Sequence, residues 1–188
     1  MDIYDSVRNI IANIERVPST TQEGIAPIGR AAQWSRYTGI TVESVVDTVV
    51  EACEQEAKRL GIPVVIAIVD ASGSLVYQRR MERALGVSIE LAPNKAYTAV
   101  AFRCGTEKLG AVVQPGTPLY GIETMVKRPI VLFGGGEPLM LENHLIGGLG
   151  ISGGTVKEDV LIVNAGLRAF QSYIQGLSLI HISEPTRL

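Results

Sequence analysis

The sequence predicts an α+β fold in which helices pack on a central antiparallel sheet. The first observation is that apolar runs with strand character are joined by short turns. Such turns are typical of antiparallel hairpins, because parallel neighbours need a crossover of a dozen or more residues. The second observation is that segments with apolar residues three and four apart flank these runs, which indicates helices with one buried face. Together they favour one layered domain.

Four segments organise the chain. Residues 1–17 are predicted to form an amphipathic helix with an apolar stripe. Residues 18–39 contain two prolines and many small residues, which predicts a linker or an irregular arm. Residues 40–176 form the main domain. Residues 177–188 resemble the translation of a sequencing adapter, so they are interpreted as a cloning or sequencing scar and left out of the fold.

The main domain opens with a helix and a hairpin. Thr41 precedes a valine-rich helical pattern that Gly61 ends, because glycine readily adopts the left-handed conformation of a helix C-terminus. Residues 63–70 then form a buried strand, residues 71–73 a turn and residues 74–80 the antiparallel return strand.

Two helices and a loop follow the hairpin. Residues 88–102 have a helical pattern, although Pro93 should kink this helix or shift its start to about Asn94. Residues 106–113 form a shorter helix. Residues 114–121 form a loop rich in proline and glycine.

The last third completes the sheet and ends in a helix. Residues 129–133 are predicted to form a strand that leads into a glycine-rich run, and residues 145–151 form the next strand after a polar turn. Thr155 and Glu158 match a capping box, in which each side chain bonds the backbone N–H of the other residue. The last helix is therefore predicted to begin at Val156.

The stretch from Gly147 to Thr155 is rich in glycine. Two short patterns match there, a dinucleotide fingerprint and a nucleophile elbow centred on Ser152. The first lacks the following parallel strand and acidic residue that hold a ribose, and the second lacks a downstream histidine outside the tail. Two alternatives remain: the N–H groups at the helix start bind an anion, or the glycines only permit a tight turn and close packing.

Composition excludes several classes of function. A net charge of −2 without a basic stripe excludes nucleic-acid binding. The chain has neither an apolar run long enough for a membrane span nor the basic segment of a secretory signal, so a cytoplasmic protein is expected. Cys53 and Cys104 have neither disulfide nor zinc spacing and are interpreted as buried or half-buried thiols.

Several motifs occur together in one order. They are Ser88-Ile89-Glu90-Leu91, Lys95-Ala96-Tyr97-Thr98-Ala99, Gln114-Pro115-Gly116, Leu119-Tyr120-Gly121, Phe133-Gly134-Gly135-Gly136-x-Pro138-Leu139 and Gly147-Gly148-x-Gly150-Ile151-Ser152-Gly153-Gly154-Thr155. This set resembles the haem-binding HbpS/GlcG-like family, which includes the C-terminal domain of PduO-type cobalamin adenosyltransferases. The resemblance covers about residues 40–175.

The resemblance implies a profilin-like α+β domain with a central antiparallel sheet, assembled into a homo-oligomer. It also implies haem as the ligand, with cobalamin as the alternative. It implies a link to glycolate use or to cobalamin-dependent diol and glycerol metabolism, often inside a bacterial microcompartment. No set of catalytic residues comes with the family.

The candidate cofactor-binding residues combine polar side chains with the glycines of two loops. They are Lys95, Tyr97, Tyr120, Gly134, Gly135, His144, Gly153 and Gly154. Haem iron takes a His, Met, Cys or Tyr ligand, and His144 is the one histidine outside the tail. Its substitutes are Tyr97, Tyr120 and Met81. Haem propionates need cations, and the candidates are Lys95, Arg79, Arg80 and Arg128.

The leading hypothesis is an accessory binding protein for haem or a related small anionic molecule, without catalytic residues. The alternative is an enzyme for a small carboxylate or aldehyde, in which Lys95 and the start of the last helix bind the charge. A third hypothesis is a structural oligomer whose segment from Asp2 to Val17 docks on a microcompartment shell or enzyme. That segment resembles encapsulation peptides, and packing on the protein's own oligomer is its other interpretation.

Overall fold

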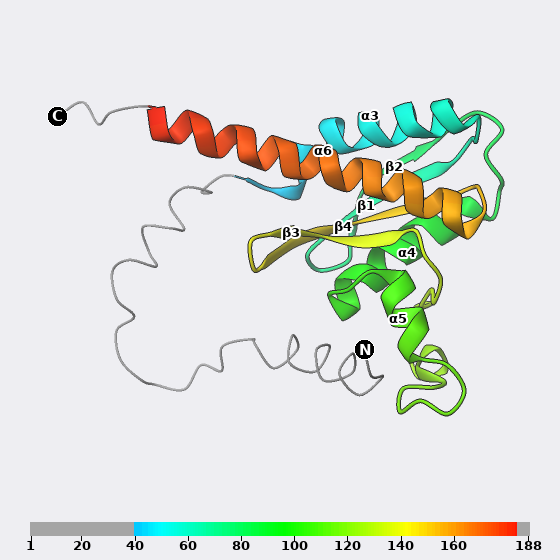
Figure 1. Ribbon diagram of the computed structural model, residues 1–188. Coiled ribbons are helices and arrows are strands. Elements are labelled where there is room, and N and C mark those ends of the chain that lie inside the picture. The colour runs from blue at the N-terminus through cyan, green and yellow to red at the C-terminus, as the bar shows by residue number, and fades with distance from the viewer. Residues whose placement is uncertain (1–39, 184–188) are drawn as a thin grey trace, which may run out of the picture.

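The computed structural model describes residues 40–183, so the predicted helix of residues 1–17 and the arm of residues 18–39 lie outside the described part. The described elements follow the predicted order of helix, hairpin, helices, hairpin and helix (Figure 1). They are α3 (Val42–Leu60), β1 (Val65–Asp70), β2 (Leu75–Arg80), α4 (Ser88–Phe102), α5 (Thr106–Val112), the 3₁₀ turn η2 (Ile122–Thr124), β3 (Gly136–Leu141), β4 (His144–Ser152) and α6 (Val156–Ser183).

The four strands form one sheet in the order β2-β1-β4-β3, and every neighbouring pair is antiparallel. Helices α3 and α6 lie side by side over one face of the sheet, and α4 covers the other face (Figure 1). The largest buried cluster joins the sheet to the α3–α6 layer and includes Val49, Ile66 and Leu149. This confirms the predicted α+β fold with a central antiparallel sheet flanked by helices.

The first helix and hairpin form as predicted. Gly61 ends α3 with φ 72°, a left-handed conformation in which its N–H bonds the last carbonyls of the helix. At the turn between β1 and β2, the Asp70 carboxylate accepts hydrogen bonds from the N–H groups of Ser72 at 2.8 Å and Ser74 at 3.0 Å. The side chain of Asp70 therefore satisfies the turn that joins the two strands.

Helix α4 runs unbroken from Ser88 through Pro93, so the start does not shift to Asn94. Proline has no N–H for the carbonyl four residues earlier, which belongs to Ile89. That carbonyl instead accepts a hydrogen bond from the Gln78 side-chain amide of β2 at 2.7 Å. The lost backbone bond is thus replaced by a contact from the sheet.

One predicted strand is in the wrong place. Residues 129–133 do not form a strand, and β3 begins at Gly136 instead. The N–H of the buried Val131 donates to the Thr98 hydroxyl of α4 at 3.0 Å, so this apolar stretch is bound to a helix rather than to the sheet. Strand β3 lies at the sheet edge, where Pro138 is tolerated although it lacks a donor.

The glycine-rich stretch lies mostly inside β4 rather than in a turn. A side chain at Gly148 would place its Cβ 2.6 Å from the Ala96 carbonyl of α4, and one at Gly150 would overlap the Ala92 carbonyl. Helix α4 packs directly on the backbone of β4 because no Cβ intervenes. Of the two alternatives, close packing therefore accounts for these two glycines.

Helix α6 begins at Val156 as predicted, behind the capping box. The Thr155 N–H donates to the Glu158 carboxylate at 2.7 Å, and the Glu158 N–H donates to the Thr155 hydroxyl at 3.4 Å. The helix continues to Ser183, whereas the sequence predicted that it was complete before residue 177. Nothing between residues 177 and 183 breaks a helix, and the next proline is Pro185. Within residues 40–183, no helix combines the length and hydropathy that a bilayer crossing requires.

Candidate functional site

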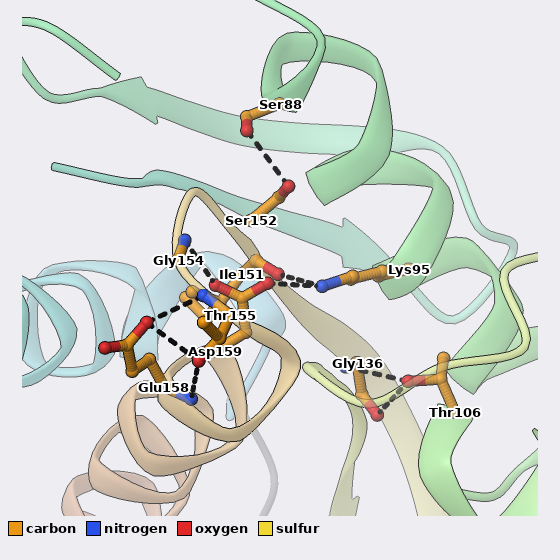
Figure 2. A network of polar contacts seen from close by, with 10 residues as sticks. All are labelled: Ser88, Lys95, Thr106, Gly136, Ile151, Ser152, Gly154, Thr155, Glu158 and Asp159. Carbon is orange, nitrogen blue, oxygen red and sulfur yellow. Dashed lines mark hydrogen bonds and ion pairs between the residues drawn. The ribbon is translucent and has the colours of Figure 1, made fainter. Parts of the chain in front are cut away.

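A fully buried ion pair joins α4 to α6. The Lys95 ammonium lies 2.6 Å from the Asp159 carboxylate and donates a second hydrogen bond to the Ile151 carbonyl of β4 at 2.8 Å (Figure 2). The exposed fraction is 0 % for Lys95 and 3 % for Asp159. The ring of Phe133 lies over the ammonium, with its centroid 5.0 Å from Nζ. Lys95 is therefore held inside the fold and does not lie on a solvated face.

Burial controls the electrostatics of this pair. Loss of hydration lowers the pKa of Lys95 and raises the pKa of Asp159, while the attraction between the two groups opposes both shifts. Removing either partner would leave a buried group with one charge and no compensation. The pair is therefore suited to hold α4 and α6 together.

Two of the four predicted site glycines contact this pair. Gly135 has φ 108°, and a Cβ there would lie 2.8 Å from Lys95 Nζ. A Cβ at Gly134 would meet Val160 of α6, and one at Gly153 would meet the Pro63 carbonyl, both at 2.5 Å. The Gly154 N–H donates to Asp159 at 3.1 Å. The structure therefore brings Gly135 and Gly154 against the ion pair, whereas Gly134 and Gly153 adjoin them in the chain and pack on other residues.

Asp159 is the member of this group that sequence reasoning missed. It follows Val156 by three residues and precedes Val163 by four, so it lies on the apolar face of α6. An acidic side chain on such a face needs a partner. Its position on the apolar face is the sequence feature that could have identified Asp159.

The start of α6 is not an open anion site. The Gly154 and Thr155 N–H groups bind the carboxylates of Asp159 and Glu158, as Figure 2 shows. Ser152, the residue of the nucleophile-like pattern, is buried and its hydroxyl donates to the Ser88 hydroxyl at 3.0 Å. The chain's own groups therefore occupy the positions that an anion or substrate would need.

The other predicted residues lie elsewhere. Tyr97 packs against Gly73 and lies under the Arg128 guanidinium, which is 3.8 Å from the ring centroid and donates to the Gly73 carbonyl. Tyr120 is 63 % exposed in the loop after α5. His144 is exposed at the start of β4, the opposite end of that strand from Ser152. These three residues do not join the Lys95 group.

A groove of ≈ 440 Å³ lies where the end of α3 meets the chain that leaves β2. It is lined by Ala57, Lys58, Gly61, Ile62, Pro63, Met81, Glu82 and Arg83. We call it the Met81 groove. A second groove of ≈ 390 Å³ lies beside the start of α3 and the β1–β2 turn, and its charged residues are Glu43 and Asp70.

Two of the arginines predicted to bind haem propionates are bound to other groups of the protein. Arg79 pairs with Glu54 of α3 at 2.8 Å, and Arg80 donates to the Ala84 carbonyl at 2.9 Å. The cations of the Met81 groove are instead Lys58 and Arg83, which the sequence analysis did not single out. In the sequence, Lys58 is one of the basic residues typical of a helix C-terminus. The fold places it beside the residues that follow β2.

The thiols match their interpretation as buried and half-buried groups. Burial raises the pKa of Cys53 to about 12 and that of Cys104 to about 11. Both therefore remain protonated near neutral pH, where a thiol is a poor nucleophile or metal ligand. Within residues 40–183, no three His, Cys, Asp or Glu side chains cluster in a way that could hold a metal ion.

Comparison with known proteins gives sequence relatives over the main domain. A family model described as "Haem degrading protein HbpS-like" matches residues 42–168. The corrinoid adenosyltransferase PduO of Salmonella typhimurium is 49% identical over 118 residues, which are 63% of this chain and 35% of that protein. An uncharacterized 15.0 kDa protein in the dhaT-dhaS intergenic region of Citrobacter freundii is 41% identical over 120 residues, 64% of this chain and 84% of its own length. The chain thus spans about a third of the length of the adenosyltransferase.

Solved structures of related proteins are also similar to this chain. A crystal structure of a PduOC–haem complex is 46% identical, with a TM-score of 0.65, and the match covers 67% of this chain and 91% of that one. The Klebsiella pneumoniae protein ORFY is 34% identical, with a TM-score of 0.67, over 71% of this chain and 91% of that one. HbpS itself has a TM-score of 0.59 at 23% identity over 81% of this chain and 95% of that one, a likeness of fold.

Proposed function

The chain belongs to the HbpS-like family, and from this premise we propose that it is an accessory binding protein for haem or a related anionic tetrapyrrole. The observation that carries the proposal is the PduOC–haem complex, which is 46% identical and matched over 91% of its length. A domain so similar in sequence and fold offers comparable surfaces to a ligand. Residues 40–176 are the proposed binding domain.

The described residues fit such a ligand. Haem is a flat apolar ring with an iron that accepts a thioether and with propionates that pair with cations. The Met81 groove combines a methionine, two cations and apolar walls, and its volume lies in the range of small-molecule sites. Bound haem would supply a redox-active iron. The chain's own residues would bind the ring and its propionates and exclude water from part of it.

A titration tests the proposal. Haemin added to the full chain should shift and sharpen the Soret absorbance and saturate at a fixed stoichiometry. We also propose that the chain forms a homo-oligomer, as the family resemblance implies, and light scattering on the same samples tests this. A folded protein that leaves the haemin spectrum unchanged contradicts haem binding.

The relatives also support a role beside cobalamin-dependent metabolism. One relative is a corrinoid adenosyltransferase, and the proposal concerns the shared domain and not the activity of that enzyme. We propose that the chain works near corrinoid enzymes, with residues 2–17 as the contact to a microcompartment shell or enzyme. The double variant Ile10→Glu, Ile14→Glu should then lose co-sedimentation with microcompartments. A dissociated oligomer would instead make this segment part of the protein's own assembly.

The structure does not favour the alternative of an enzyme for a small carboxylate or aldehyde. It required Lys95 and the start of α6 to bind a substrate's charge, and both are bound to side chains of the protein.

A further inference from the structure

We propose that the Met81 groove is the tetrapyrrole site of this chain, with the Met81 sulfur as iron ligand and with Lys58 and Arg83 on the propionates. The inference rests on the proposed function and adds where the ligand binds and which side chains hold it.

The fold fixes the backbone on both sides of the groove. On one side, Gly61 ends α3 and the Ile62 N–H bonds the Ala57 carbonyl at 2.9 Å. On the other, the Met81 N–H donates to the Val64 carbonyl at 3.0 Å, directly after the last register pair of β1 and β2. The side chain of Met81 is half-buried against the main core cluster. The thioether therefore follows directly on the end of β2 and is fixed by a backbone hydrogen bond to the residue before β1, which favours a defined ligand position.

Met81 is the iron-binding side chain best placed for this role. Among the residues that line the two described grooves, it is the only His, Met, Cys or Tyr. A thioether binds iron without losing a proton, whereas the thiols of Cys53 and Cys104 remain protonated near neutral pH. Tyr97 is covered by Arg128. Met81 thus needs neither deprotonation nor removal of another side chain.

Charge separates the two grooves. The Met81 groove has two cations, Lys58 and Arg83, against one carboxylate, Glu82, and so attracts an anion. The other groove contains the carboxylates of Glu43 and Asp70, which would repel propionates. Lys58 already lies 3.3 Å from Glu54, so a propionate there competes with an exposed pair of low strength. An anionic tetrapyrrole is therefore directed to the Met81 groove.

Part of the groove is apolar. Ala57, Ile62 and Pro63 line its wall, and Leu85 and Val87 follow Arg83 along the chain with most of their side chains exposed. Arg83 has φ 68°, a conformation uncommon for a residue with a side chain, and it lies at the rim of the groove.

The test compares methionine variants in haemin titrations of the full chain. Met81→Leu conserves volume, so the fold should survive. It should weaken haemin binding by about tenfold or more, the order of loss seen when support of a metal site is removed, and should eliminate the near-infrared charge-transfer band of methionine-ligated ferric haem. Met125→Leu is the matched control, because Met125 is 78 % exposed and lies outside the groove. It should leave affinity and spectrum as in the wild type.

The outcomes separate the site from the function. If the wild type leaves the haemin spectrum unchanged, the proposed function fails and the site with it. If the wild type binds haemin and Met81→Leu binds it with the same affinity and spectrum, the site is wrong while the function stands. Should Met81→Leu fail to fold, Lys58→Glu with Arg83→Glu decides, because both side chains are exposed. That charge reversal should weaken haemin binding at low salt, and unchanged affinity overturns the site.

Discussion

The ion pair of Lys95 and Asp159 and the Met81 groove place charged groups in opposite environments. At the ion pair, the ammonium donates hydrogen bonds to the Asp159 carboxylate and the Ile151 carbonyl, and glycines let the backbone close around it. At the groove, Lys58 and Arg83 are exposed and lie beside a half-buried thioether. The first arrangement stabilises the fold, and the second is available to a ligand. Unusual residues in a sequence therefore do not by themselves indicate where a ligand binds.

The largest effect is expected when the ion pair is broken. Lys95→Met leaves the Asp159 carboxylate buried without its cation, which should lower the free energy of unfolding by about 3–5 kcal/mol. Urea denaturation measures this loss. The double variant Lys95→Met, Asp159→Leu should recover much of it, because both charges are then gone. A single variant as stable as the wild type would mean that the pair does not hold α4 to α6.

The next effect tests close packing of α4 on β4. Gly150→Ala places a methyl group into the Ala92 carbonyl, and overpacking of this kind should destabilise by about 1–3 kcal/mol. Gly86→Ala is the matched control, because a Cβ there meets nothing within 4 Å. Thermal melts of the two variants should differ by several degrees. Equal melting temperatures would mean that α4 moves away at little cost.

A smaller effect is expected in the pH dependence of stability, through Glu137 of β3. Burial raises the pKa of Glu137 above its ordinary 4.5. The folded protein then holds this proton more tightly than the unfolded chain does, so stability falls as pH rises from 4.5 through the raised pKa. Glu137→Gln removes the titration. Urea midpoints measured between pH 4 and pH 7 should therefore shift in favour of the variant as pH rises, and a constant difference would contradict this.

Features that follow from a local pattern within one helix, strand or turn were predicted from the sequence. Features that depend on contacts between two elements were missed. The valine stripe of α3, the β1–β2 hairpin and the Thr155 capping box are local patterns, and all three form as predicted. The strand at residues 129–133 does not form, because Val131 hydrogen-bonds to Thr98 of α4 and the neighbouring apolar residues pack against Leu109 and Val112 of α5. Gly136 and Pro138 made β3 difficult to recognise in the sequence.

The candidate site divides in the same way. Lys95, Gly135 and Gly154 were predicted to bind a cofactor. The structure places them near one another, and Asp159 completes the group through a contact across 64 residues of chain. Lys58 and Arg83 come from different elements, and neither has a pattern of its own. Partnership across the fold is the information that one sequence lacks.

The smallest change in stability is expected at the Met81 groove. Lys58→Gln with Arg83→Gln removes two exposed cations, so the free energy of unfolding should change by less than about 0.5 kcal/mol. The reason is that neither cation is buried, and the contact of Lys58 with Glu54 is an exposed pair that water screens. Urea denaturation at low and high salt checks this expectation. A loss as large as that of Lys95→Met would make the groove a second structural centre, and the contrast between a closed pair and an open groove would no longer hold.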